Sequence, residues 1–114
     1  MKVVFYKKDS GREPIKEDIC KLENDDKAEI VACLKDIEDV GFNSNRVQFR
    51  KIDGKLWEIK IETKNCGYRI FYVVIDGDII LLLHFYKKQS QKAPRKEIEV
   101  AMKRMKDVIN KNMR

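Results

Sequence analysis

Hydrophobic positions in the first third of the chain repeat with the spacing of one short strand followed by two helices. The apolar run at residues 3–6 predicts a β-strand that ends in a polar, glycine-containing stretch. Apolar residues at helical spacing follow Pro14, which suits the first turn of a helix. A second helix is predicted from the cap sequence at residues 24–26 to Gly41, where a glycine suits a helix C-terminus.

The second half of the chain changes to the alternation typical of strands. Residues 56–62 alternate strictly, and residues 68–74 are rich in aromatic and β-branched side chains. Residues 79–86 are almost entirely apolar, so we expect this strand to be covered on both faces. The turn sequences at residues 65–67 and 76–78 join the three strands into an antiparallel meander.

A last helix completes the predicted fold. It opens at Pro94, with Ala93 at the expected N-cap, and its apolar residues form one stripe: Ile98, Ala101, Met102, Met105 and Ile109. The order β-α-α-β-β-β-α predicts a small α+β domain that spans residues 1–114. We expect a twisted antiparallel sheet packed with an N-terminal helical hairpin and the C-terminal helix.

Composition narrows the class of protein. Of the 114 residues, 43% are hydrophobic and 39% are charged, which excludes both a disordered tail and an integral membrane protein. The N-terminus carries too short an apolar stretch for a signal peptide, and the three cysteines are widely spaced. We therefore expect a cytoplasmic protein with reduced thiols. With one histidine and no metal-ligand spacing, we expect no metal and no cofactor.

The net charge of +6 is unevenly distributed. Residues 1–45 hold 8 basic residues (Lys and Arg) and 11 acidic residues (Asp and Glu), whereas residues 46–104 hold 14 basic and 7 acidic residues. The basic excess coincides with the predicted strands, which indicates either a surface for a polyanion, with nucleic acid the first candidate, or a generally basic, solvated surface. For the first interpretation, the expected RNA-binding residues are Arg50, Lys55, Tyr86, Lys87 and Lys92.

Arg69 stands out because it lies among apolar residues in a central strand. A buried guanidinium needs a carboxylate or a bound anion, and Glu58 on the neighbouring strand is the local carboxylate. Lys60 shares the face of Glu58, and Lys88 follows the last strand. In a curled sheet these four residues would line one concave patch. Such a patch suits metal-free phosphodiester cleavage, in which an arginine stabilises the phosphate charge and a lysine or glutamate moves a proton.

Two aromatic-ring residues near this patch each allow two interpretations. His84 is either a hydrogen-bonded histidine of the core or edge, or a general acid at the lip of the cleft. Tyr86 either stacks on a nucleobase or packs inside the protein. The nuclease interpretation requires that Arg69 and the lysines converge in a hollow that solvent can reach.

Four segments in a fixed order carry a resemblance to a known family. They are LWEIKI at residues 56–61, GYRIFY at 67–72, LLHFYKK at 82–88, and Pro94 followed by EIEVA at 97–101. From residue 3 to residue 105 the chain resembles the phage-associated HigB branch of the RelE/ParE toxin superfamily. The resemblance implies the toxin of a type II toxin–antitoxin pair. Such toxins are mostly ribosome-dependent endoribonucleases that cut mRNA, and a cognate antitoxin, in this branch usually of helix-turn-helix type, blocks them.

The resemblance also implies roles for individual residues. Arg69 matches the strand arginine that contacts the scissile phosphate, Lys60 a strand lysine, and Lys88 a basic residue that supports the leaving group. Glu58 stands where the RelE type has another lysine, so the general base stays open between Glu58 and Lys60. The last helix lacks the family's first-turn tyrosine and C-terminal catalytic residue, for which Tyr86 and His84 are the available substitutes. A gyrase inhibitor resembling ParE and a non-catalytic nucleic-acid-binding relative remain the alternatives.

Overall fold

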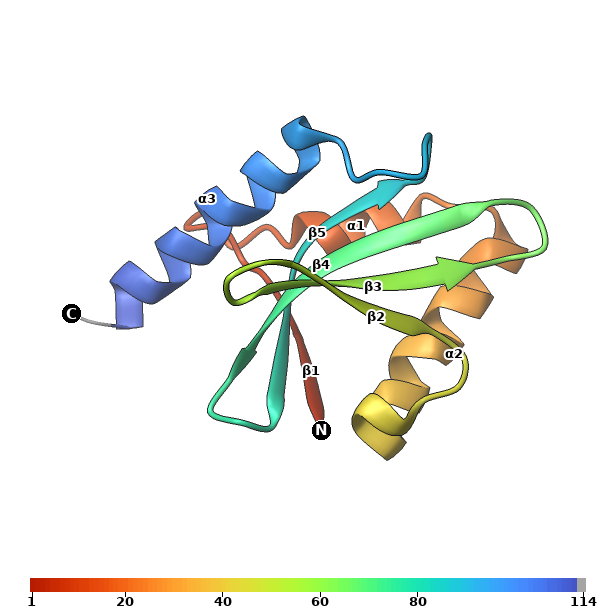
Figure 1. Cartoon of the computed structure of the whole chain (residues 1–114), viewed down its shortest axis with the longest axis horizontal. Helices are drawn as coiled ribbons and strands as arrows, with labels where there is room; N and C mark the ends of the chain where they lie inside the picture. The colour runs from red at the N-terminus through yellow and green to blue at the C-terminus, as the bar shows by residue number, and fades with distance from the viewer. Residues whose placement is uncertain (113–114) are drawn as a thin grey trace.

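The computed structural model describes residues 1–112, which form five strands, three α-helices and one short 3-10 helix. The strands are β1 (Lys2–Phe5), β2 (Gln48–Asp53), β3 (Leu56–Glu62), β4 (Gly67–Ile75) and β5 (Ile79–Lys87). The helices are α1 (Pro14–Cys20), α2 (Asn24–Val40), α3 (Arg95–Asn112) and the 3-10 helix η1 (Gly41–Asn43). The strand order is β1-β5-β4-β3-β2 in a single sheet (Figure 1).

Helices cover the two faces of the sheet unequally. The Tyr68 hydroxyl on β4 reaches Asp26 in α2, whereas His84 on β5 contacts Glu97 in α3. Register places Tyr68 and His84 on opposite faces, so α2 and α3 lie on opposite sides of the sheet (Figure 1). Because α3 packs on β5 and β4, the α3 side of the sheet is left without a helix over β2 and β3.

The predicted α+β fold is confirmed, with two differences in the sheet. The strand β2 was not predicted, because a β-bulge between Lys51 and Asp53 interrupts its alternation. The sheet is also not wholly antiparallel, because β1 pairs in parallel with β5 at its edge. The last helix starts one residue later than expected, and the Pro94 carbonyl accepts the amide of Ile98.

Burial matches only part of the apolar stripes expected in the helices. Ile30 and Ile37 of α2 and Ala101 of α3 have no exposed surface, whereas Val31 and Val40 of α2 and Ile109 of α3 are exposed. Within residues 1–112, the helices lack the combination of length and hydropathy that a membrane-spanning segment requires.

Asp26 ties the first turn of α2 to the turn between β3 and β4. Its carboxylate accepts hydrogen bonds from the Tyr68 hydroxyl at 2.6 Å and the Asn65 amide at 3.0 Å, and the Cys66 thiol lies at 3.6 Å. The hydroxyl of Tyr68, followed by the Asn65 amide, holds the pKa of Asp26 below its usual value against the opposing effect of burial. This anchor fixes the start of β4, the strand that carries Arg69.

We predict that the Asp26 anchor weakens in acid. Because the pKa of Asp26 is lower in the folded than in the unfolded chain, its contribution is complete above the unfolded value of about 3.9. It is lost as the pH falls through the folded value. Urea unfolding should show that the free energy of unfolding of the natural chain exceeds that of Asp26→Asn at pH 7, and that this difference shrinks below about pH 4. A difference that stays constant down to pH 2 would contradict the assignment.

Candidate functional site

Strand alternation and register collect the predicted catalytic side chains on the α3 side of the sheet. Residues directly opposite one another on neighbouring strands share a face and lie about 5 Å apart. When opposed residues on this face are followed from strand to strand toward β5, they form three rows. The rows are Arg50–Glu58–Phe71–His84, Lys60–Arg69–Tyr86 and Glu62–Gly67–Lys88. All five predicted catalytic residues therefore belong to one surface, which we call the site face.

A bulge in β5 creates this arrangement. Phe71 lies opposite His84 but Tyr72 lies opposite Leu82, so Leu83 is an extra residue in the ladder. If the ladder continued regularly from Leu82, Leu83 would lie opposite Phe71 and Phe85 opposite Arg69, and His84 would turn to the other face. The bulge thus re-aims one histidine and one tyrosine toward the arginine, as bulges beside functional sites do.

Arg69 is buried and paired with two carboxylates. Only 4% of its side chain is exposed, its Nε lies 4.0 Å from Glu58 Oε1, and its Nη1 lies 3.2 Å from Glu62 Oε1. Nη1 also donates to the Tyr68 carbonyl at 2.9 Å. The two glutamates occupy the diagonal positions on either side of Lys60, which is directly opposite Arg69. The interpretation of Arg69 as the partner of Glu58 is thereby confirmed.

Glu58 is the buried centre of the cluster. It has no exposed surface, and its Oε1 lies 2.7 Å from Nη2 of Arg50, whose side chain is 38% exposed. Its Oε2 accepts a hydrogen bond of 3.0 Å from the Tyr86 hydroxyl. Burial, reinforced by the charge of Glu58, raises the pKa of Tyr86, so this phenol stays protonated and donates. Tyr86 is accordingly a packed, hydrogen-bonded residue, with 9% of its surface exposed.

α3 holds His84 in place. Its Nε2 lies 2.9 Å from Glu97 Oε1, and its Nδ1 lies 3.4 Å from Arg104 Nη1. A neutral imidazole protonated on Nε2 satisfies both neighbours, because it donates to the carboxylate and accepts from the guanidinium. Of the two interpretations of His84, the hydrogen-bonded histidine matches these contacts.

The nuclease interpretation requires that the charged groups converge and that solvent reaches them, and the structure meets only the first of these conditions. The charged groups converge on one face, but solvent does not reach Arg69 or Glu58 in this conformation. Lys60 is half-buried and Lys88 is partly exposed. Lys60 and Glu62 line a small hollow of about 170 Å³ together with the loop before β2. The accessible groups of the site face are therefore Arg50, Lys60, Glu62 and Lys88, while the Arg69–Glu58 pair is enclosed.

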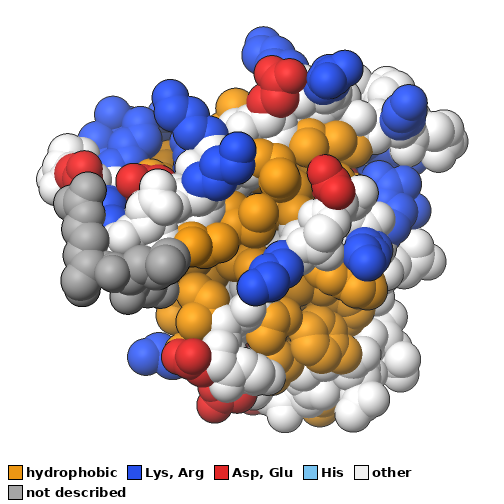
Figure 2. Space-filling model, turned by 60° about the vertical axis from the view of Figure 1, so that its left-hand side comes forward, with side chains coloured by type: hydrophobic (Ala, Val, Ile, Leu, Met, Phe, Trp, Pro, Cys, Tyr) orange, Lys and Arg blue, Asp and Glu red, His pale blue; other side chains and the backbone are white. Residues whose placement is uncertain are grey.

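The remaining predicted RNA-binding residues are spread more widely. Lys55 is exposed in the turn between β2 and β3, and Lys92 is exposed in the loop between β5 and α3. Lys87 lies opposite Tyr68, so its side chain belongs to the other face. In Figure 2 hydrophobic side chains gather in the middle of the view, with Lys and Arg side chains around them.

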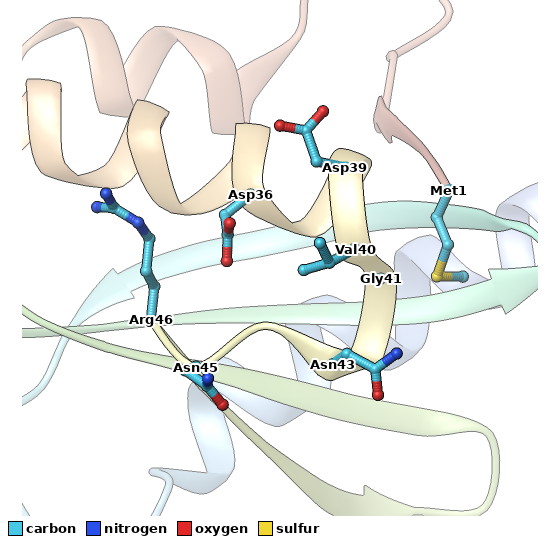
Figure 3. Close-up of a pocket in the computed structure, with 8 residues that line it drawn as sticks. All are labelled: Met1, Asp36, Asp39, Val40, Gly41, Asn43, Asn45 and Arg46. Atoms are coloured by element: carbon cyan, nitrogen blue, oxygen red, sulfur yellow. The ribbon is translucent and has the colours of Figure 1, made fainter.

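A broad hollow at the far end of α2 contains none of the predicted residues. Asp36 from α2 and Arg46 from the loop before β2 point toward the same opening (Figure 3). Asp36 already accepts a hydrogen bond of 2.5 Å from Ser44, and Arg46 lies 3.8 Å from Glu29. Asp36 and Arg46 therefore each have a partner on the protein, Ser44 and Glu29 respectively.

Glu62 is the residue of the cluster that sequence reasoning missed. Its side chain is 61% exposed, which is unlike the buried Glu58, although both pair with Arg69. The signal was available in the sequence, because Glu58, Lys60 and Glu62 alternate along one strand and so share a face. Recognising the pair required the register of β3 against β4.

Residues 17–106 match the family described as phage derived protein Gp49-like (DUF891). The chain belongs to this family. The Gp49-like family is RelE-like and is associated with the toxins of toxin–antitoxin systems. The match spans β2 to β5 and therefore includes every residue of the three rows. No curated protein matches this Gp49-like chain.

We predict that Glu58 is essential for stability. Glu58→Gln would leave Arg69 buried with a single, exposed carboxylate, and removing one partner of a buried ion pair typically costs about 3–5 kcal/mol. Urea unfolding at pH 7 measures the loss. Glu99→Gln is the matched control, because Glu99 pairs with Arg95 in a solvent-exposed contact on α3. Equal, small losses in the two variants would contradict the central role of Glu58.

Proposed function

We propose that this Gp49-like protein is the toxin of a type II toxin–antitoxin pair, of the HigB-like branch, and that it inhibits translation by cutting mRNA on the ribosome. The observation that supports this proposal is the convergence of Arg50, Lys60 and Arg69 on the face of the sheet that α3 leaves partly open. In a toxin-associated family, arginine and lysine side chains gathered on one partly open face suit direct contact with the phosphodiester backbone of RNA.

The proposed reaction uses the nucleophile that RNA itself supplies. The 2′-oxygen attacks the adjacent phosphorus, the bond from phosphorus to the 5′-oxygen breaks, and a 2′,3′-cyclic phosphate and a 5′-hydroxyl result. Lys60 takes the proton from the 2′-hydroxyl as a neutral amine, since a charged ammonium has no lone pair to accept it. Glu58 is not placed to do so, because it is fully buried between two arginines and Tyr86. Arg69 stabilises the charge that develops on the phosphate oxygens, and Lys88 gives a proton to the leaving 5′-oxygen.

The proposed partner is a cognate antitoxin of helix-turn-helix type. A protein that damages mRNA must be neutralised until it is needed, and the family association with toxin–antitoxin systems supports such a pair. An antitoxin has two ways to act on this chain: it can cover the exposed cations around the site face, or it can hold the buried Arg69 in its paired state.

The burial of Arg69 and Glu58 favours a second candidate function. If the pairs seen here persist on binding, the protein would act by contact without cleaving RNA, either as a ParE-like inhibitor of gyrase or as a nucleic-acid-binding relative. The two candidates differ in their requirement for Lys60 as a proton acceptor.

We predict that Lys60→Ala abolishes the proposed cleavage. Loss of a group that moves a proton lowers the rate by about 100-fold or more, so induced expression should no longer arrest growth and primer extension should find ribosome-bound mRNA intact. Lys51→Ala is the matched control, because Lys51 is an exposed lysine on neighbouring strand β2 that lies opposite Trp57 and so faces the other side.

Two results would contradict the nuclease. Normal cleavage by Lys60→Ala would overturn the assignment of the proton acceptor. Growth arrest by the natural chain with intact mRNA would select the contact-acting alternative, and relaxed or broken DNA in those cells would identify gyrase as the target.

A further inference from the structure

The carboxylate of Glu62 lies close over Gly67, in a position that a Cβ atom there would crowd. A Cβ atom at position 67 would lie 2.7 Å from Glu62 Oε2, 3.2 Å from Glu62 Oε1 and 3.3 Å from Arg69 Nη1. The space above Gly67 therefore holds a planar anion, the Glu62 carboxylate, against Nη1 of Arg69. In the strand register, Lys60 on β3 lies beside this space, and Lys88, which comes directly after β5, lies opposite Gly67.

The two carboxylates that pair with Arg69 differ in how easily they can leave. Glu58 is fully buried, forms an ion pair with Arg50 and accepts a hydrogen bond from Tyr86, so it has no solvent-exposed direction in which to leave. Glu62 is 61% exposed, and the 3.2 Å contact with Arg69 is its ion pair in the structure. An ion pair with one solvent-exposed partner is weak, and an anion of similar shape can replace that partner.

We propose that the space above Gly67 is a phosphate-binding position and that Glu62 fills it as an internal competitor until RNA arrives. On binding, a backbone phosphate takes the place of the Glu62 carboxylate on Arg69 Nη1, and the glutamate turns out into solvent. Glu58 meanwhile keeps the guanidinium in its orientation. The proposal deepens the RNA-cutting function proposed above and rests on it for the identity of the ligand.

This exchange resolves the conflict between the burial of Arg69 and a role in binding. A backbone phosphodiester carries the same single negative charge as the carboxylate that it replaces and is flanked by two lysines, so the exchange keeps Arg69 paired throughout. The small hollow beside Lys60 and Glu62 gives the displaced side chain an open direction in which to move.

The test measures binding in the absence of cleavage. The probe is a fluorescently labelled single-stranded RNA made wholly of 2′-O-methyl nucleotides, which lack the attacking hydroxyl, and the readout is anisotropy at low salt with inorganic phosphate as competitor. Glu62→Gln removes the competing charge and should tighten RNA binding about fivefold, the size expected for loss of one exposed ion pair. Glu99→Gln removes the same charge on α3, away from Gly67, and should leave binding nearly unchanged.

The second variant tests the position itself. Gly67→Ala places a methyl group in the proposed phosphate space, so the double variant Glu62→Gln/Gly67→Ala should lose the gain. Urea unfolding of each variant confirms that the chain is folded. Equal tightening by Glu62→Gln and Glu99→Gln, no change with Glu62→Gln, or a gain that survives Gly67→Ala would each overturn the proposal. Because the RNA cannot be cut, these outcomes are independent of whether the natural chain is a nuclease.

Discussion

The site face depends on one requirement: the guanidinium of Arg69 lies in a central strand and must be neutralised there. Arginine cannot lose its proton at any physiological pH, so burial forces it to find carboxylates. The strand beside it supplies two, at the diagonal positions on either side of Lys60. Glu58 in turn draws in Arg50 and the Tyr86 hydroxyl. Four strands are thereby linked by a polar network in an otherwise apolar sheet, and such networks favour one register over its alternatives.

The polar network lies on one of the two faces of the sheet, and different elements cover the two faces. On the α2 side, apolar side chains and the Asp26 anchor fix the sheet to the helices. On the other side, α3 packs over β5 and β4 and holds His84 through Glu97 and Arg104. The network lies at the boundary between the covered and uncovered parts of that side. α3 covers the His84 end of this face, while Lys60 and Glu62 line the hollow beside the loop before β2.

Much of the fold follows from the sequence, because period and turn residues act locally. The strictly alternating segment became β3, the Asp-Gly turn joins β4 to β5, and Gly41 ends α2 with a positive φ of 62°. The features that were missed depend on long-range pairing. The bulge in β2 disrupts the local period, and nothing in a strand's own sequence fixes whether its neighbour runs parallel, as β1 does beside β5.

For the site, alternation predicted that Glu58 and Lys60 share a face, but only the bulge at Leu83 brings His84 and Tyr86 to it. The pairing of Glu62 with Arg69 likewise depends on register.

The distribution of charge separates long-range attraction from local chemistry. The basic excess lies in residues 46–104, yet inside the site face each arginine is matched by a glutamate. Exposed lysines such as Lys55, Lys87 and Lys92, on different sides of the chain, give attraction to a polyanion that is sequence-independent and sensitive to salt. The paired cluster adds little to that attraction, because its charges cancel beyond a few ångströms. A phosphate gains from it only on direct contact, where it must compete with Glu62. The cluster therefore discriminates among anions by their fit to the space above Gly67, whereas exposed surface charge attracts polyanions without regard to shape.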